Sequence, residues 1–413
     1  MTRWLLAESG ARGQGTEGGS REGRHLTFAA WLAVATAGGA LAACGGEKVA
    51  GRTPIAFASV SAGSDHTCGL TPSGAAYCWG YDAYGALGDG TTTSSPTPVP
   101  VAGALTFTVL SAGAEHTCGL TRAGAAYCWG HNGFQAIGDG TATNRTTPTL
   151  VSGGYTFVAV TAGLTHTCGL TATGAAYCWG QNVYGALGDG TSADRSAPVA
   201  VTGGLTFTTL SAGGLYTCAL TTAGAAYCWG FNFYGQVGDG TTTNRWAPVA
   251  VSGGLSFASL SSGGDHACAV TSAGVAYCWG ANAVGELGIG TIADGYLTTP
   301  VVAARGLAFA AFSAGGQHSC GVTSAGAAYC WGENAEGELG DGNMAGPENC
   351  ASVCSMTPTA VAGRLVFGTV SAGDRHTCGL SAAGTVYCWG WNQYGQLGNG
   401  TKVTSDVPVL VVQ

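Results

Sequence analysis

The sequence predicts an all-β protein, a seven-bladed β-propeller with four antiparallel strands in each blade. The main observation is an internal repeat: Tyr-Cys-Trp-Gly occurs seven times, at steps of 50 residues that lengthen to 52 and then 58. Each copy holds four short apolar runs separated by Gly, Thr, Asp and Asn, as expected of strands joined by turns. Four-stranded units that must stack to bury their faces form a propeller. The seven motifs begin at Tyr77, Tyr127, Tyr177, Tyr227, Tyr277, Tyr329 and Tyr387.

The second copy shows the expected elements in order. The first strand starts at 107–110, and the second alternates His, Cys and Leu over 116–120. The third covers 125–129, and its Tyr and Trp rings share a face that we expect to pack on small Ala and Gly residues of the neighbouring blade. The fourth follows Pro148, which can open an edge strand without breaking a ladder. Because the ring must close, we expect the last strand, at 408–412, to complete a blade shared with N-terminal strands.

The N-terminus is predicted to direct export. Arg21 and Arg24 precede an uncharged, Ala-rich apolar stretch at 26–43, which is the layout of a secretory signal. The Leu-Ala-Ala-Cys run that ends at Cys44 resembles the lipobox of bacterial lipoproteins. This resemblance implies that Cys44 is lipidated and that the protein lies in the bacterial cell envelope, held to the membrane only through the lipid. A plain secretory signal, giving a secreted protein, is the alternative. The predicted parts are a signal segment at 1–43, a linker at 44–53 and the propeller at 54–413, with an insertion near 343–357.

Two cysteines in every copy lie ten residues apart, on either side of the turn between the second and third strands. They face each other across an antiparallel pair, where Cα atoms about 4.5 Å apart suit a disulfide. Without Cys44 the 17 cysteines leave an even number, so we expect eight disulfides and an oxidising compartment. The expected pairs are Cys68–Cys78, Cys118–Cys128, Cys168–Cys178, Cys218–Cys228, Cys268–Cys278, Cys320–Cys330, Cys378–Cys388 and, in the insertion, Cys350–Cys354.

A metal site formed by His66, Cys68 and Cys78 is the alternative for the first pair. This arrangement is not a recognised zinc spacing, and Tyr216 replaces the histidine in the fourth copy. We therefore expect no metal and interpret the six repeat histidines as hydrogen-bonding residues inside the blades. The Asp of Gly-Asp-Gly-Thr is interpreted as a turn residue. A calcium site is the alternative, which is disfavoured because Ile289 and Asn399 take the place of Asp in two copies.

Charge and composition exclude several classes of function. The 14 Lys and Arg against 22 Asp and Glu give a formal charge of −8, so the chain lacks the basic surface that nucleic acid requires. No irregular cluster of acids, bases or nucleophiles stands out from the repeat, so we expect neither an enzyme nor a cofactor.

The residues that follow Trp-Gly vary between copies and are the candidate binding residues. Loops on rigid scaffolds carry function, and aromatic side chains dominate protein interfaces. Local packing against the next blade is the alternative role for the same rings. The candidates are Tyr81, Tyr84, His131, Phe134, Tyr184, Phe231, Tyr234, Trp391 and Tyr394. Secondary candidates are the variable pairs before the repeat histidine, such as Asp374-Arg375, and an acidic group at Glu333, Glu336 and Glu338.

The repeat resembles that of the regulator of chromosome condensation family. The shared pattern is Gly-x-x-His-x-x-x-Leu followed by Tyr-x-Trp-Gly-x-Asn-x-x-Gly-x-Leu-Gly. In the second copy it appears as Gly113, His116, Leu120, Tyr127, Trp129, Gly130, Asn132, Ile137 and Gly138. The resemblance implies a seven-bladed propeller.

Members of that family differ in function. The founding member is a nuclear exchange factor for a small GTPase, while secreted bacterial members include inhibitors that cap β-lactamases through propeller loops. We expect an exported, monomeric scaffold that binds a protein partner through its variable loops. The alternatives are a guanine-nucleotide-exchange regulator and a propeller that binds carbohydrate.

Overall fold

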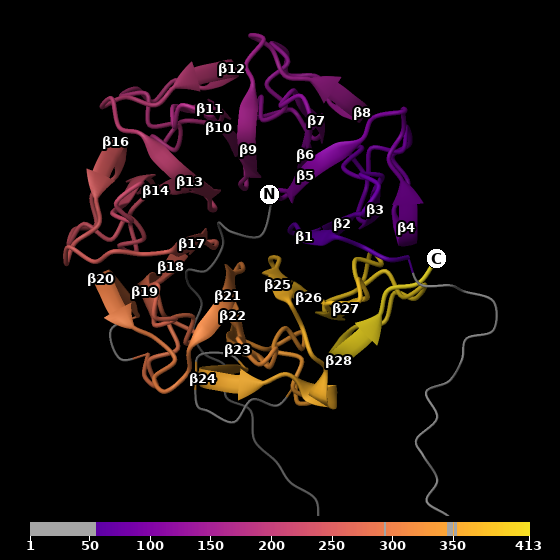
Figure 1. The fold of residues 1–413 in the computed structure, drawn as a ribbon, viewed down its shortest axis with the longest axis vertical. Helices are drawn as coiled ribbons and strands as arrows, with labels where there is room; N and C mark the ends of the chain where they lie inside the picture. The colour runs from indigo at the N-terminus through magenta and orange to yellow at the C-terminus, as the bar shows by residue number, and fades with distance from the viewer. Residues whose placement is uncertain (1–54, 293–294, 345–349, 351–352) are drawn as a thin grey trace, which may run out of the picture. The chain divides into compact units, whose positions relative to one another are not determined.

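The computed structural model describes residues 55–292, 295–344, 350 and 353–413. The predicted signal segment and linker, with the predicted lipidation site Cys44, lie outside the described residues. The described chain forms seven four-stranded antiparallel sheets arranged in a ring, which confirms the predicted fold (Figure 1). No helix in these ranges is long and apolar enough to cross a membrane.

Each blade consists of four consecutive strands, and the first strand lies nearest the centre of the ring (Figure 1). The first two blades are β1 (Ser59–Ala62), β2 (His66–Leu70), β3 (Ala76–Gly80), β4 (Ser95–Pro100) and β5 (Phe107–Ala112), β6 (His116–Thr121), β7 (Ala126–Gly130), β8 (Arg145–Leu150). The third and fourth are β9 (Phe157–Ala162), β10 (His166–Thr171), β11 (Ala176–Gly180), β12 (Arg195–Ala200) and β13 (Phe207–Ala212), β14 (Tyr216–Thr221), β15 (Ala226–Gly230), β16 (Arg245–Ala250). The fifth and sixth are β17 (Ser259–Ser262), β18 (His266–Val270), β19 (Ala276–Ala281), β20 (Tyr296–Val302) and β21 (Phe309–Ala314), β22 (His318–Thr323), β23 (Ala328–Glu333), β24 (Cys354–Ala360). A short 3-10 helix, η1 (Ala362–Arg364), leads to the seventh, β25 (Thr369–Ala372), β26 (His376–Leu380), β27 (Val386–Gly390) and β28 (Ser405–Leu410).

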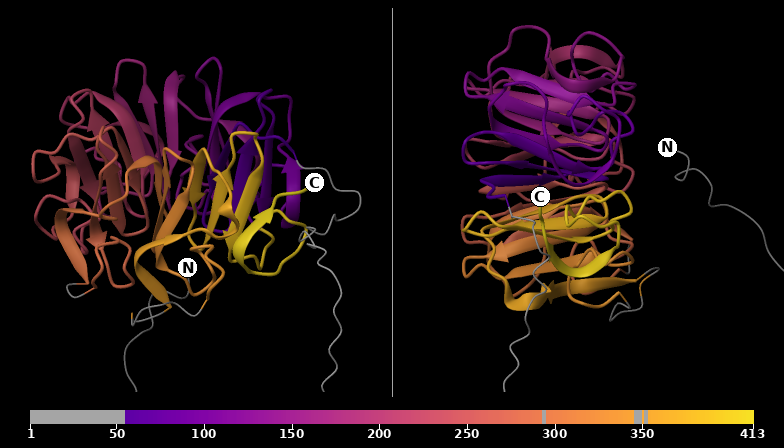
Figure 2. Two further views of the ribbon diagram at one scale, coloured as in Figure 1. Left: turned by 60° about the horizontal axis from the view of Figure 1, so that its bottom comes forward. Right: turned by 90° about the vertical axis from the view of Figure 1, so that its right-hand side faces the viewer.

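The prediction of how the ring closes was wrong. The last strand, β28, pairs with β27 and completes its own blade, which shares no strand with the N-terminal blade. The first and last blades are therefore both complete, and they stand side by side like the other neighbouring blades (Figure 2). The Phe57 N–H donates to Gly384 O at 2.8 Å, and the Gly400 N–H donates to Pro96 O at 2.9 Å. Because equivalent bonds join every other pair of neighbouring blades, closure needs no exchanged strand.

The fourth strand begins earlier than predicted. In the second blade β8 starts at Arg145, so Pro148 lies inside the strand. The register shifts there: Cys128 pairs with Thr149, whereas Gly130 pairs with Arg145. Proline is tolerated because it occupies this irregularity on the outer edge, where no ladder bond from its nitrogen is required.

The apolar core lies between the blades. Tyr227 and Trp229 of β15 pack on the face of the third blade that carries Cys168, Leu170 and Cys178. The rings thus pack on smaller side chains as predicted, but that surface is a disulfide with Leu and Ala. The seven Trp residues of the motif are fully buried, and replacing one by Ala would destabilise the fold by about 3–5 kcal/mol.

Disulfides join the second and third strands of all seven blades, with Cα atoms 4.1 Å apart and the cysteines fully buried. Cys350 and Cys354 form an eighth. The sulfurs of Cys68 and Cys78 are bonded to each other, so the alternative metal site with His66 is not formed. So many disulfides indicate an oxidising compartment.

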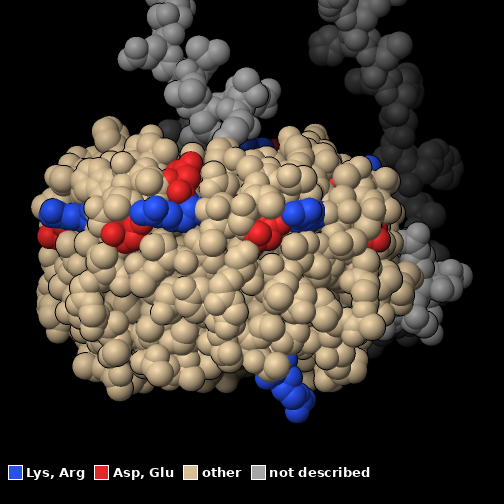
Figure 3. Space-filling view, turned by 90° about the horizontal axis from the view of Figure 1, so that it is seen from above, with Lys and Arg blue, Asp and Glu red and all other residues tan. Residues whose placement is uncertain are grey.

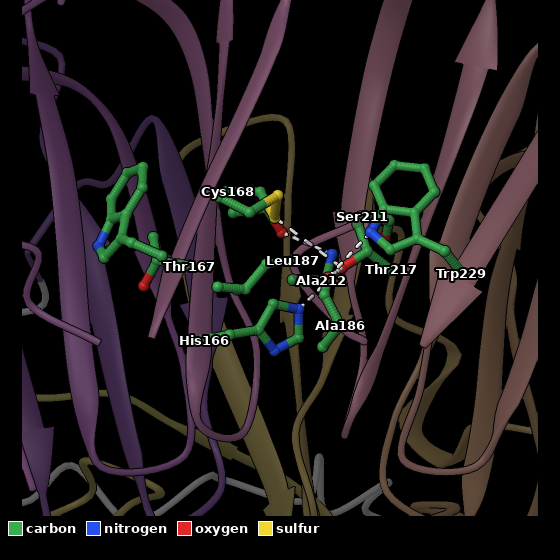
Figure 4. The surroundings of a disulfide bond; sticks show 12 residues. His166, Thr167, Cys168, Ala186, Leu187, Ser211, Ala212, Thr217 and Trp229 are labelled. Carbon is green, nitrogen blue, oxygen red and sulfur yellow. Dashed lines mark hydrogen bonds between the residues drawn. A yellow bond between two sulfur atoms is a disulfide. The ribbon is translucent and has the colours of Figure 1, made fainter. Parts of the chain in front are cut away.

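Hydrogen bonds cross the seams between the blades. His166 Nε2 lies 2.8 Å from Thr217 Oγ1 of the next blade, and Trp229 Nε1 donates to Ala186 O at 2.9 Å (Figure 4). The Thr217 hydroxyl donates to the same carbonyl, so the imidazole N–H is the donor to Thr217. Burial lowers the pKa of His166 to about 4 and keeps the ring neutral at pH 7. The repeat histidines are therefore buried hydrogen-bonding residues, as predicted, and their bonds reach the next blade.

The fourth blade replaces this histidine with Tyr216. The buried Tyr216 hydroxyl donates to the carbonyl of His266 in the fifth blade. Ala267 stands in the fifth blade where the other blades have Thr or Ser, and it packs with Tyr216 in one cluster. The smaller Ala267 leaves room for the larger ring, so the two departures from the repeat compensate each other.

Candidate binding face

The variable loops after Trp-Gly are attached to the ring in the same way. The N–H of the first loop residue donates to the carbonyl of the residue before the repeat His or Tyr, as from Tyr81 to Asp65 at 2.8 Å and from Phe231 to Leu215 at 3.0 Å. This bond recurs in all seven blades. The loops and the turns between the first and second strands therefore share one face of the ring, which we call the loop face.

A buried Asn fixes the loop in six blades. In the second blade Asn132 Oδ1 accepts from the Ile137 N–H, and Nδ2 donates to Thr141 O, both at 3.0 Å. The first blade has Asp82 in this place. Its Oδ1 accepts from the Leu87 N–H at 2.8 Å, but its buried Oδ2 has no hydrogen-bond partner. Burial raises the pKa of Asp82 to about 7.

Six of the nine predicted binding residues form a continuous row of rings over the seventh, first and second blades. We call this set the long aromatic row. The rings follow each other along the loop face, and each touches the next. The centroid distances are 5.3 Å for Trp391–Tyr394, 4.6 Å for Tyr394–Tyr81, 6.3 Å for Tyr81–Tyr84, 4.6 Å for Tyr84–His131 and 5.5 Å for His131–Phe134. Arg375 lies over the Trp391 ring at 5.3 Å.

The other three form a second group with Phe233 on the third and fourth blades. We call this group, Tyr184, Phe231, Phe233 and Tyr234, the short aromatic cluster. Centroids are 5.0 Å apart for Tyr184–Phe231 and 5.1 Å apart for Phe233–Tyr234. Phe233 is 62% exposed, and the sequence reasoning missed it. Comparing the copies at this loop position could have identified it, because the position holds exposed Val183 in the third copy but Ala, Gly or Gln in the rest.

The structure shows features of both roles considered for these rings, local packing against the next blade and an exposed surface for binding. Tyr84 packs on His131 of the next blade, and Tyr184 packs on Phe231 in the same way. Yet 36% of Tyr84 and 38% of Tyr184 remain exposed. The rings thus hold one another in place and still present apolar surface, which is the arrangement of a pre-organised binding site.

Acidic residues occupy the corresponding place in the sixth blade. Burial raises the pKa of Glu333, and Asp374 and Glu336 add to the effect. Glu338 is 1% exposed; its Oε2 accepts from the Glu336 N–H at 2.9 Å, whereas its Oε1 has no partner. Burial raises the pKa of Glu338 to about 8.

Charges on the outer rim are paired. In the second, third and fourth blades the Asp of Gly-Asp-Gly-Thr accepts from the Thr two residues on and also binds an Arg six residues on, which the turn interpretation did not include. The pairs are Arg145–Asp139, Arg195–Asp189 and Arg245–Asp239, at 2.5 to 2.8 Å. Adjacent blue and red atoms mark this rim in Figure 3. Pairing therefore compensates the charge of the turn Asp in these three blades.

The described ranges contain no cluster of three or more His, Cys, Asp and Glu that could hold a metal ion. A groove of about 430 Å³ lies at the seam between the first and last blades, lined by Phe57, Pro72, Leu380 and Gly384. The turns between second and third strands form this groove, so it lies at the other strand ends from the loop face.

Comparison with known proteins places this repeat in a family. Two models of the regulator of chromosome condensation (RCC1) repeat match; one covers residues 57–86, 107–135, 157–186, 207–236, 257–286, 309–338 and 369–396, the other 73–120, 123–170, 173–220, 223–270, 325–380 and 383–413. Among the curated proteins none matches significantly.

Solved structures share the fold. Yeast RCC1 (Prp20), in a crystal structure with Kap60, has a TM-score of 0.73 at 20% identity over 86% of this chain and 85% of that one. Prp20p from Saccharomyces cerevisiae, described with its binding to Gsp1p and histones, has 0.73 at 21% identity over 86% and 87%. The CRINKLY WD40 ectodomain of the Arabidopsis thaliana receptor kinase ACR4 has 0.51 at 21% identity over 81% and 96%. Because the family models match along most of the propeller, the chain belongs to the RCC1 repeat family.

Proposed function

We propose that this protein is an exported, lipid-anchored scaffold that binds a protein partner through its loop face. The observation that carries the proposal is that rings from five neighbouring blades gather on one face, in contact yet partly exposed. Aromatic side chains held in place by neighbours supply interface energy at low entropic cost. Yeast RCC1, which shares the fold, is described bound to Kap60, so the fold can serve protein binding.

The compartment is part of the same proposal. We propose that residues 1–43 are removed, that Cys44 carries the lipid and that the folded chain is a monomer in the cell envelope. The buried disulfides support an oxidising compartment. A reducing cytoplasm would not maintain them, which disfavours a role as an exchange factor for a cytoplasmic GTPase. No catalytic role is proposed.

The binding role is tested with the chain purified from its native envelope and used to capture partners from an envelope extract. The double variant Tyr184→Ser, Phe233→Ser removes exposed rings of the short aromatic cluster. Val158→Ser removes an equally exposed apolar side chain near the start of β9, toward the opposite face, and is the matched control.

We expect the parent and Val158→Ser to capture the same protein and the double variant to lose it, while all three keep the same melting temperature. Equal capture by all three would refute binding through the loop face. Retention of all three on a glycan array, with no protein captured, would favour the carbohydrate alternative. Intact mass spectrometry tests the compartment, because a lipidated Cys44 and no free thiols are expected, whereas an unprocessed reduced chain would refute export.

A further inference from the structure

Two parts of the loop face differ chemically. On the third and fourth blades, which carry the short aromatic cluster, the turns before the repeat His or Tyr hold Leu164, which is 45% exposed, and Leu215. On the fifth, sixth, seventh and first blades the corresponding turns and loops carry carboxylates, which we call the acidic arc. Its members are Asp265, Glu286, Glu333, Glu336, Glu338, Asp374 and Asp65.

The acidic arc is one electrostatic unit. Burial raises the pKa of Asp65 to about 6, and Asp374 of the neighbouring blade contributes to the shift. Burial raises the pKa of Glu286 to about 7, with contributions from Glu333 and Asp265 in the sixth and fifth blades. Carboxylates on four blades therefore interact with each other. Arg375 lies over the Trp391 ring with its Nε 3.9 Å from Asp374 Oδ2, and it lowers the pKa of Asp65.

The short aromatic cluster and the acidic arc meet at the fourth and fifth blades. The Gln236 side chain accepts from the Tyr234 N–H at 3.0 Å through Oε1 and donates to Asp265 Oδ1 at 3.0 Å through Nε2. One buried amide therefore connects the short aromatic cluster to the first carboxylate of the arc. A ligand lying across this junction would touch apolar rings and carboxylates together.

Glu338 shows that a carboxyl group is not needed at this place in the fold. In the fourth and seventh blades its place is taken by Gln236 and Gln396, whose side chains accept the same loop N–H. A glutamine would therefore fix the loop of the sixth blade equally well. Glu338 instead adds a buried carboxylate with an unpartnered Oε1 beside Glu333 and Glu336.

We propose that the partner is a protein that presents a basic segment, with Lys or Arg next to an apolar anchor. The anchor packs in the short aromatic cluster, and the basic side chains lie along the acidic arc. Charge complementarity carries the argument, because a cation brought to clustered carboxylates stabilises their ionised form, and such pairing sets specificity and on-rate. This inference rests on the proposed function and specifies its partner.

The test selects binders from a random library of disulfide-cyclised peptides against the folded, disulfide-intact protein. We expect the selected peptides to carry Lys or Arg beside Trp, Phe or Leu. Glu333→Gln with Glu336→Gln should weaken their binding about tenfold, as should about 1 M salt, at which the Debye length is about 3 Å. Asp194→Asn is the control, since it removes a carboxylate outside the arc from a position where Asn144 and Asn244 stand in other blades.

The outcomes separate the two proposals. Peptides that lose binding with Tyr184→Ser, Phe233→Ser but carry no excess of Lys and Arg, or bind the Gln variant normally, would overturn only the basic-segment inference. Peptides that bind every variant alike would count against the loop face itself. Binding that depends on both the rings and Glu333 with Glu336, but not on Asp194, is the expected result.

Discussion

Asp82→Asn should stabilise the protein, and the gain should depend on pH. Six blades fix the loop with an Asn whose amide uses both ends, whereas in the first blade Asp82 leaves a buried oxygen without a partner. The Asn variant restores the Nδ2 donor that bonds the Thr141 carbonyl in the second blade. The main-chain bond from Leu87 to Oδ1 is kept.

The size of the effect follows from the raised pKa. Burial raises the pKa of Asp82 from 3.8 to about 7 in the folded protein. The stability contributed by the protonated folded form is complete below the unfolded value and is lost as the pH rises through the folded value. At about pH 8 the ionised form therefore destabilises the fold by up to about 4 kcal/mol, at 1.4 kcal/mol per pKa unit. We expect Asp82→Asn to recover about 2–4 kcal/mol at pH 8 and little near pH 4.

The assay is the melting temperature of parent and variant from pH 4 to pH 8, with the disulfides intact. The difference between them should widen as the pH rises, because other buried carboxylates titrate alike in both proteins. Asn132→Asp in the second blade is the reciprocal control and should lower the melting temperature most at high pH. A melting-temperature difference that is the same at both ends of the range would refute the reasoning.

Two further predictions concern the seams and the disulfides. Tyr216→His alone should destabilise the fold by about 2–4 kcal/mol, because a cavity opens and Ala267 offers the imidazole no hydroxyl; adding Ala267→Thr should recover part of the loss, and denaturant unfolding that shows simple additivity would contradict the compensation. Cys168→Ala with Cys178→Ala should reduce stability by about 3 kcal/mol, as expected for so short a loop, and an unchanged melting temperature would show that the staple is dispensable.

The repeat made most of the fold predictable. A period of about fifty residues with four apolar runs determines the blade, and the ten-residue spacing of the cysteines determines the hairpin register. How the ring closes was not predictable from the same pattern. The same strands could form a ring in which the termini lie between two blades, or a ring in which one blade contains strands from both ends of the chain. Residues near the two termini determine how the ring closes. The Phe57 N–H, for example, donates to Gly384 O, as the equivalent Phe does at every other seam.

The candidate site was predictable only in part. Counting positions after Trp-Gly located nine ring-bearing residues, but Phe233 lies between the two positions that were compared and is among the most exposed. The ion pair of Arg145 with Asp139 was missed because it joins a turn residue to the first residue of β8, although Arg recurs at the same spacing in the third and fourth copies. Which rings touch depends on the placement of adjacent blades, which a single copy does not contain.

Within one loop, different residues determine its shape and form its exposed surface, which explains why this surface can vary. The residues that shape each loop are buried beneath it: Asn132 bonds the main chain on both sides, and Trp129 donates to Ala86 O of the preceding blade. The side chains of Phe231 and Phe233 make no such bond to the frame, since only the Phe231 main chain is tied to Leu215. Replacing them therefore alters the surface without disturbing what holds it. Aromatic rings and the carboxylates of the acidic arc can coexist on one frame for that reason.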